Sequence, residues 1–250
     1  MSELQLPPHV IERLRTARSI TALTGGVLAY ECGVPGFRQA QAADERWAAL
    51  EPQELATAEA FLRNPRLVWE WFAYRRALSE AATPGPAFYA LVDLEQIPQR
   101  FKLITQAVDG MHWRAGSREL LELHGSLART RCFDEGSLVE SWDERESPPR
   151  CDHCRGYLRP DVVLYGEGVP AERIREADAA TICDVFLCVG TDSVVQPAAS
   201  LPLHAKRNGA FVIEISPKPS AFTIFADFAL HGSPAELLPA LVRLIEQAAG

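Results

Sequence analysis

The sequence lacks a hydrophobic run of the roughly 18 residues that a membrane-spanning helix needs, and it lacks an excess of positive charge. Its 25 lysine and arginine residues face 33 aspartate and glutamate residues, which gives a formal net charge of -8. This balance argues against general binding to nucleic acid or to an acidic membrane surface. We therefore expect neither nucleic acid nor a membrane among its partners.

The chain also shows no internal repeat, no low-complexity segment and no secretory signal pattern. Residues 1–19 mix charged and apolar side chains, unlike a signal peptide, so we expect a cytoplasmic protein. Cysteine is scarce. In a reducing compartment the six cysteines are expected to be metal ligands or core residues rather than disulfides: Cys32, Cys132, Cys151, Cys154, Cys183 and Cys188.

Short apolar runs alternate with helical stretches along the 250 residues. This order predicts an α/β fold in which helices cover both faces of a parallel sheet. Ligands bind such sheets beyond the carboxyl ends of the strands, so the loops after the strands are the candidate site. Strands are predicted at 19–23, 101–105, 120–124, 162–165, 185–189 and 211–215, and helices at 8–17, 51–82 with a break at Pro65, 87–96, 170–180, 197–208 and 234–248.

Residues 128–159 differ from the rest because they are charged and hold three cysteines. Cys151 and Cys154 form a C-x-x-C knuckle, and Cys132 precedes it by 19 residues. Zinc accepts carboxylate as well as thiolate, so these cysteines predict a structural zinc site. Its fourth ligand would be Glu135, Asp134 or His153. The alternative is a module that packs without metal. A short module with little apolar content, however, is more stable when it binds a structural metal ion.

A series of motifs runs along the chain in a fixed order. They are Thr24-Gly25, GVPGFR at 33–38, TQAVDG at 105–110, HWRAGS at 112–117, ELHG at 122–125, the cysteine module, RPDVVLYGE at 159–167, GTDSVVQPA at 190–198 and EISP at 214–217. This series resembles the sirtuins, the NAD-dependent protein-lysine deacylases. The resemblance covers nearly the whole chain, and its specificity comes from the order of the motifs.

The resemblance implies a discontinuous Rossmann-like NAD-binding domain and a small domain. The large domain would comprise 1–38, 100–127 and 158–250. The small domain would combine a helical insert, 39–99, with a zinc-ribbon-like module, 128–157. NAD and an acyl-lysine peptide would meet in the cleft between them. The acyl oxygen would attack the nicotinamide ribose and nicotinamide would leave, yielding free lysine and O-acyl-ADP-ribose.

The resemblance also assigns roles to individual residues. His124 matches the general base, and an imidazole suits removal of a proton from a ribose hydroxyl near neutral pH. The acyl-lysine strand would pair with the segment containing Val162, Val163, Tyr165 and Gly166 by β-augmentation. NAD would contact Gly25, Gly26, Phe37, Arg38, Gln106, Asp109, Gly190, Thr191, Asp192, Ser193 and Ser216.

A helical segment, WEWFAYRR at 69–76, is similar to the one that desuccinylase-type sirtuins use. They place Tyr-x-x-Arg there to hold an acyl carboxylate, and this chain has Phe72 and Arg75. Arg75 can pair with a carboxylate. Tyr74 would point elsewhere on a helix and would not replace the missing phenol. The alternative for Arg75 is an exposed, charged helix face.

Several positions depart from the family pattern. The family has Gly-Ala-Gly-Ile-Ser after the threonine, where this chain has Gly25-Gly26-Val27-Leu28-Ala29. Val27 adds bulk where glycine permits close approach of a pyrophosphate, and Ala29 removes a hydroxyl. The resemblance implies that most of the departures line one cleft: Val27, Ala29, Tyr30, Phe72, Ala107, Trp113, Leu164, Asp192 and Ser216. Gly168 also differs, near the acyl tunnel.

Two of these departures bear directly on cofactor use. Ala107 stands where the family has an Asn that orients the nicotinamide ribose. Loss of such a donor costs about 2.7–4 kcal/mol, by analogy with oxyanion-hole deletions. The charge of Asp192 would repel a pyrophosphate, although a carboxylate also holds ribose hydroxyls and suits a helix N-cap.

These observations leave three functional hypotheses. The first is an NAD-dependent lysine deacylase of altered or reduced activity, with zinc and NAD as cofactors and an acyl-lysine protein as substrate. The second is a sirtuin-fold protein without this activity, whose remodelled cleft binds another ligand. The third is another NAD-consuming reaction, such as glycohydrolysis or ADP-ribosyl transfer. No feature of the sequence indicates an oligomeric state.

Overall fold

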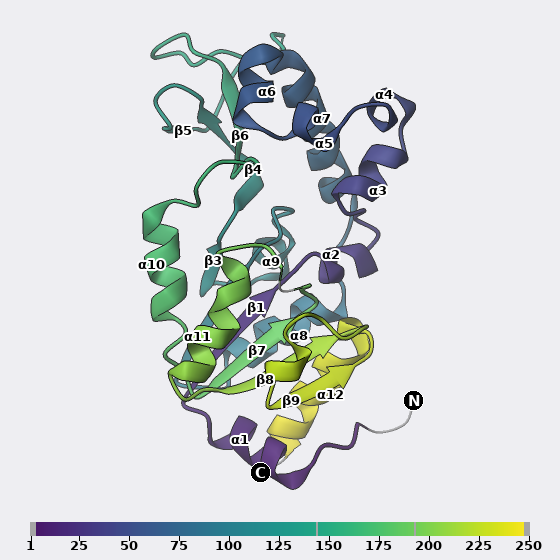
Figure 1. The fold of residues 1–250 in the computed structure, drawn as a ribbon, viewed down its shortest axis with the longest axis vertical. Helices are drawn as coiled ribbons and strands as arrows, with labels where there is room; N and C mark the ends of the chain where they lie inside the picture. The colour runs from purple at the N-terminus through teal and green to yellow at the C-terminus, as the bar shows by residue number, and fades with distance from the viewer. Residues whose placement is uncertain (1–3, 144, 193, 248–250) are drawn as a thin grey trace.

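The computed structural model describes residues 4–143, 145–192 and 194–247. Within them, a parallel sheet has the strand order β3-β2-β1-β7-β8-β9 (Figure 1). The order places β1, β2 and β7 side by side at the centre, so the loops that follow them meet at one edge. The strands are β1 Ser19–Thr24, β2 Arg100–Thr105, β3 Leu120–Glu122, β7 Val185–Val189, β8 Phe211–Ser216 and β9 Phe228–His231.

Alternation along the buried strands builds a separate core on each face of this sheet. Ile20 and Ala22 of β1 join the core under α1 (Pro8–Thr16), α8 (Pro86–Glu95) and α12 (Pro234–Gln247), whereas Leu23 joins the opposite core under α11 (Leu201–Arg207). Successive side chains of a strand point to opposite faces, so a continuous apolar run contributes side chains to both cores. The helices α9 (Met111–Ala115) and α10 (Ala171–Ala179) complete the two layers, with the short η1 (Ala198–Ser200) before α11. The parallel sheet and these helices form the large lobe of the molecule.

The small lobe holds an antiparallel sheet and a group of helices. Its strands, in the order β5-β4-β6, are β4 (Gly125–Cys132), β5 (Leu138–Val139) and β6 (Leu158–Val162). This lobe lies at the end of the molecule opposite α1 (Figure 1). Its core is aromatic, built on Trp47, Phe61 and Trp71. The helices are α3 Phe37–Ala42, α4 Glu45–Ala48, α5 Pro52–Leu55, α6 Ala58–Arg63 and α7 Pro65–Ala81.

The predicted fold class is confirmed, and the structure corrects some elements. The strand predicted at 162–165 lies earlier, at Leu158–Val162, and pairs antiparallel with β4 instead of joining the parallel sheet. The edge strand β9 was not predicted. The small sheet begins at Gly125 and ends at Val162, so it extends past the expected module of 128–157 at both ends. No helix in the described residues is long and apolar enough to cross a membrane.

Candidate active-site cavity and candidate metal centre

A cavity of about 530 Å³ opens beyond the carboxyl ends of β1, β2 and β7. Three loops of the large lobe line it, and Phe37 and Arg75 reach it from α3 and α7. Its lining includes Gly25, Gly26, Val27, Ala29, Tyr30, Gln106, Ala107, Asp109, Gly190, Thr191 and Asp192. The cavity therefore lies where a doubly wound sheet binds its ligands.

Two glycines allow the loops after β1 and β7 to touch. A Cβ on Gly25 would lie 2.4 Å from the carbonyl oxygen of Gly190, a contact that no side chain tolerates. Gly190 has a φ of 58°, which favours glycine. A Cβ there would lie 2.8 Å from the Cβ of Val27. The side chain of Val27 therefore packs against the loop after β7, at a position where the family pattern has a bare backbone.

Gln106 connects the loops around the cavity. Its backbone N–H donates to the carbonyl of Thr24 (3.0 Å), and its side-chain Nε2 donates to Oγ1 of Thr191 (2.8 Å). Its own carbonyl oxygen lies 3.1 Å from Nδ1 of His124. One residue thus bridges the ends of β1 and β2, the loop after β7 and the candidate base.

The imidazole of His124 is held in one tautomer. A carbonyl oxygen only accepts hydrogen bonds, so Nδ1 carries the proton and Nε2 keeps its lone pair. Burial lowers the pKa of His124, the bond to the Gln106 carbonyl opposes this, and the charge of Arg173 lowers the pKa further. His124 is therefore neutral at pH 7 and able to accept a proton at Nε2.

Two charged side chains line the cavity on the side of the small lobe. Burial raises the pKa of Asp109, although its carboxylate accepts a bond from the backbone N–H of Met111 (2.9 Å). Burial lowers the pKa of Arg75, which the carboxyl of Asp109 opposes. The Arg75 guanidinium carbon lies 5.9 Å from the ring centres of both Phe37 and Trp71.

Arg75 carries an unsatisfied donor. Its Nη1 is buried and has no hydrogen-bond partner among the described residues. Buried donors in native proteins are almost always paired, and Arg75 lines the cavity. An anionic group in the cavity would supply the missing partner.

His112 is a structural residue whose role the sequence did not predict. Its Nε2 lies 2.9 Å from Oγ1 of Thr24, and its ring packs on Phe88. Burial lowers the pKa of His112 to about 3, so the imidazole is neutral and joins α9 to the end of β1. Its place in the HWRAGS motif was the signal that could have indicated this role.

The segment after β6 runs beside His124. The Val163 N–H donates to the carbonyl of His124 (2.8 Å), and the Tyr165 N–H donates to the carbonyl of Ala56 (2.8 Å). Tyr165 is exposed, and its ring lies 6.0 Å from that of Phe37. This segment joins the candidate base to the helical group and carries an exposed aromatic at the junction.

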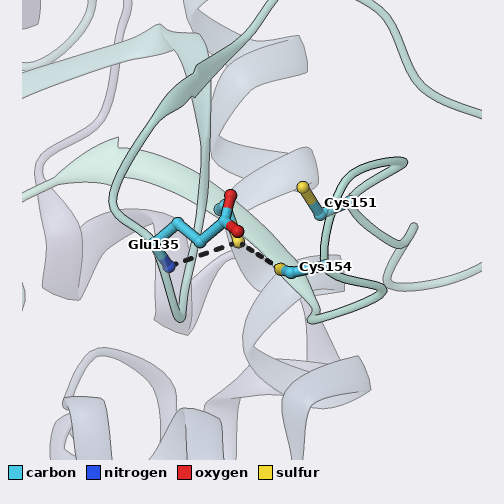
Figure 2. Close-up of side chains that lie close together, drawn as sticks. Glu135, Cys151 and Cys154 are labelled. Carbon is cyan, nitrogen blue, oxygen red and sulfur yellow. Dashed lines mark hydrogen bonds between the residues drawn. The ribbon is translucent and has the colours of Figure 1, made fainter.

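The small lobe also holds a group of metal-ligating side chains. Figure 2 shows Glu135, Cys151 and Cys154 converging from two loops, and Cys132 at the end of β4 completes the group. Their ligand atoms all lie within 4.8 Å of one another. The Sγ atoms of Cys132 and Cys154 are 3.4 Å apart.

Three sulfurs and one carboxylate match the donor types and number of a tetrahedral structural zinc site. Of the candidates for the fourth ligand, the structure brings Glu135 into the group rather than Asp134 or His153. His153 instead donates from Nδ1 to the Glu135 carboxylate (2.7 Å). A histidine in that position orients a ligating carboxylate.

Residues 25–197 match the Sir2 family. The chain belongs to this family. It is 44% identical over 241 residues to NAD-dependent protein deacylase 2 of Pyrobaculum aerophilum, covering 96% of both proteins. It is 41% identical over 244 residues to NAD-dependent protein deacylase 1 of Pseudomonas aeruginosa, covering 94% of this chain and 97% of the relative. The sirtuin resemblance of the motifs is confirmed.

Solved Sir2 structures agree with this assignment. A Sir2 homologue in complex with NAD superimposes with a TM-score of 0.89 at 36% identity, covering 100% of this chain and 98% of the other. Sir2Af2 bound to a myristoylated histone peptide gives a TM-score of 0.75 at 32% identity, with 96% of each chain covered. The expected class, an NAD-dependent deacylase, is also the class named for the relatives.

Not every predicted site residue of this Sir2 protein lines the cavity. Nine do: Gly25, Gly26, Phe37, Arg75, Gln106, Asp109, Gly190, Thr191 and Asp192. His124 adjoins it through its bond to Gln106, and Tyr165 through its ring contact with Phe37. Val163 is connected to it only through His124. The remaining predicted residues that the structure describes do not line it: Arg38, Phe72, Val162, Gly166 and Ser216. Ser193 lies outside the described residues.

Four of the nine departures that were expected to share one cleft do not line the active-site cavity. Phe72 and Leu164 are buried in the aromatic core of the small lobe, and Ser216 lies at the end of β8. Trp113 lines a second cavity of about 510 Å³, between α7, α9 and β4. Asp109 contributes to both cavities. Val27, Ala29, Tyr30, Ala107 and Asp192 do share the active-site cavity.

Proposed function

We propose that the protein is an NAD-dependent protein-lysine deacylase that binds NAD in the active-site cavity and uses His124 as the general base. The observation that carries the proposal is the position of Gln106. Its side chain lines the cavity and bonds Thr191, while its carbonyl holds the imidazole of His124. The base and the cofactor cavity are thus connected through one residue.

The proposed reaction assigns a separate role to each group of residues. Bound NAD supplies the ribose carbon that the acyl oxygen attacks and nicotinamide as the leaving group. His124, neutral and protonated at Nδ1, takes a proton from a ribose hydroxyl at Nε2. Val163, which bonds to the carbonyl of His124, and Tyr165 lie on the segment that would pair with the acyl-lysine strand. A zinc ion held by the three thiolates and the carboxylate of the metal group stabilises the small lobe without joining the reaction.

The remodelled loops support an activity lower than that of a sirtuin with the family pattern. Val27 packs against Gly190 beside the cavity, and Ala107 offers no side-chain donor. We expect both changes to weaken contacts to NAD. The same contact of Val27 is what favours the second candidate, a sirtuin-fold protein whose cavity takes another ligand. Cleavage of NAD without acyl-lysine is the third candidate.

Arg75 supports a preference for acyl groups that end in a carboxylate. Its buried Nη1 lacks a partner among the described residues, and a carboxylate gives Arg a strong charge-assisted bond. Phe72 is buried in the core, so no phenol from that position assists. We therefore expect an acyl group that ends in a carboxylate, such as succinyl, to be preferred over acetyl, which offers Arg75 no charged partner.

The cytoplasmic location and the absence of nucleic-acid partners remain predictions from the sequence.

Titration of NAD into the purified, zinc-loaded protein tests the proposal. We expect a dissociation constant below about 1 mM, or about -4 kcal/mol. We then expect turnover of succinyl-lysine peptide to exceed that of acetyl-lysine peptide and to disappear in His124→Ala. Absence of NAD binding would reject both NAD-dependent hypotheses. Binding with nicotinamide release that does not depend on acyl peptide would favour the third candidate.

A further inference from the structure

An ion pair between a buried arginine and a partly exposed glutamate anchors the segment that joins His124 to the helical group. Arg159 on β6 donates from Nη1 and Nη2 to the two carboxylate oxygens of Glu167, at 2.6 and 2.9 Å. The Arg159 side chain is 7% exposed and that of Glu167 28%. Arg159 also donates to the carbonyl of Val162 (2.7 Å). The guanidinium therefore fixes both the start and the end of the intervening segment.

Glu167 reaches the same segment directly. Its Oε2 accepts a bond from the backbone N–H of Leu164 (2.9 Å). Burial raises the pKa of Glu167, but the bonds from Arg159 and from the Leu164 N–H outweigh this and leave the pKa below its ordinary value. The carboxylate is therefore charged at neutral pH, as the ion pair requires.

Three successive amides of this segment thus have three different anchors. Val163 bonds to the carbonyl of His124, Leu164 to the carboxylate of Glu167 and Tyr165 to the carbonyl of Ala56. Two of these acceptors are backbone groups. The anchor at Leu164 is the one that depends on a side chain.

The same ion pair touches the stretch of chain that carries the metal ligands. The guanidinium carbon of Arg159 lies 5.8 Å from the ring centre of Phe133. Phe133 directly follows Cys132 in the chain, and its N–H donates to the carbonyl of Tyr157 (2.9 Å). Contacts therefore run without interruption from the metal-ligand loop through Phe133 and Arg159 to Glu167.

We propose that Arg159 and Glu167 are positioning residues that hold residues 163–167 in the form that receives the acyl-lysine peptide. This inference rests on the proposed function. A partly buried ion pair adds little net stability, because desolvation of the buried charge offsets the attraction and water screens the exposed one. Its bidentate geometry instead selects one arrangement of the groups that it joins. Loss of the pair is expected to weaken peptide binding and to leave NAD binding unchanged.

The first test uses Glu167→Gln, which keeps an acceptor for Leu164 and removes the charge that Arg159 requires. We expect the peptide KM to rise at least about tenfold, while the NAD dissociation constant and kcat change less than about twofold. Glu167→Asp keeps the charge and should restore part of the affinity. Equal changes for NAD and peptide, or an unchanged peptide KM, would overturn the proposal.

The matched control is Asp227→Asn. Asp227 also pairs with a cation, Lys206 (2.5 Å), and also accepts a backbone N–H, that of Val212 (2.9 Å). It does not line the active-site cavity. We expect this variant to leave both the peptide KM and the NAD dissociation constant within about twofold of the wild type.

A second pair of changes separates positioning from stability. Arg159→Met combined with Glu167→Leu replaces the ion pair with apolar side chains, which often preserves or raises stability. We expect a Tm close to that of the wild type together with the raised peptide KM. If the double variant had both a Tm and a peptide KM close to those of the wild type, the pair would act only on stability, and the proposal would be overturned.

Hydrogen exchange tests the positioning without any substrate. In Glu167→Gln the amides of 163–167 should exchange at least about tenfold faster than in the wild type, while those of β1 keep their protection. If the wild type binds no acyl peptide but this change occurs, the proposed function fails and the positioning stands. If the amides of 163–167 exchange at the same rate in Glu167→Gln and in the wild type, the positioning role is rejected, whatever the peptide binding shows.

Discussion

The large and small lobes of this molecule are held together by different interactions. The parallel sheet lies between two apolar cores, and Leu23, Leu103 and Phe186 are fully buried in them. The small lobe has an aromatic core, but its sheet also depends on charges. Asp161 on β6 is buried and pairs with arginines on β4, Arg129 at 3.0 Å and Arg131 at 3.4 Å. We therefore expect loss of one polar contact to destabilise the small lobe more than the large lobe.

The departures from the family pattern follow the same division. In the large lobe, Val27 and Ala107 lie in segments that follow strands and line the cavity. In the small lobe, Phe72 and Leu164 are buried in the aromatic core, and Glu135 belongs to the group of side chains that could hold a metal ion. Changes in the large lobe are therefore expected to alter ligand binding, whereas changes in the small lobe alter its folding.

The largest expected effect comes from breaking the metal centre. Cys151→Ser removes one of the three thiolates, and structural zinc contributes about 10–16 kcal/mol of apparent binding free energy in small zinc modules. We expect loss of bound zinc and rapid hydrogen exchange throughout β4–β6, while β1 and β7 stay protected. Cys183→Ser, outside the metal group, is the control. Retention of one zinc per chain in Cys151→Ser would contradict the assignment.

A smaller effect is expected from restoring an amide in the large lobe. Ala107→Asn places a hydrogen-bonding side chain in the cavity, and such donors lower a reaction barrier by about 2.7–4 kcal/mol, or about a hundredfold in rate. We expect kcat/KM for NAD to rise by that factor in a deacylation assay, with the Tm within a few degrees of the wild type. Ala107→Leu, which adds bulk without a donor, should not raise it. An unchanged rate in Ala107→Asn would mean that other loop residues limit the activity.

The smallest effect concerns acidification of the large lobe. The folded-state pKa of His112 is about 3 and its unfolded value is about 6.5, so below pH 6.5 the unfolded chain binds a proton that the native state does not. The corresponding stability is fully present above about pH 6.5 and is lost as the pH falls toward 3. At about pH 5 the loss is about 2 kcal/mol.

Urea unfolding of the wild type and of His112→Gln at about pH 7 and about pH 5 measures this difference. The lowered pKa of His124 acts in the same direction, so comparison of the two proteins isolates His112. We expect the variant to lose less stability on acidification. An equal loss in both proteins would show that His112 is not the group responsible.

Most of the large lobe could be predicted from local patterns. The strands 19–23, 101–105, 185–189 and 211–215 are short apolar runs, and each lies within one residue of its predicted bounds. The strand predicted at 162–165 was misplaced because β-branched residues suggested it there. The true strand contains Arg159, Pro160 and Asp161, which propensity disfavours. Proline is tolerated because β6 lies at an edge of its sheet, and Asp161 is tolerated because arginines on β4 neutralise it.

The sequence by itself determined the family, the parallel sheet, the thiolates of the metal group and the identity of the candidate base. These features are recorded in periodicity, spacing and motif order, which are local properties of a chain. Only the tertiary structure decided that Glu135 completes the metal group, that Trp113 faces a second cavity, that Phe72 is buried and that Arg75 has a buried donor without a partner among the described residues. Each of these depends on which distant segment packs against the residue, because burial and pairing are properties of the folded neighbourhood.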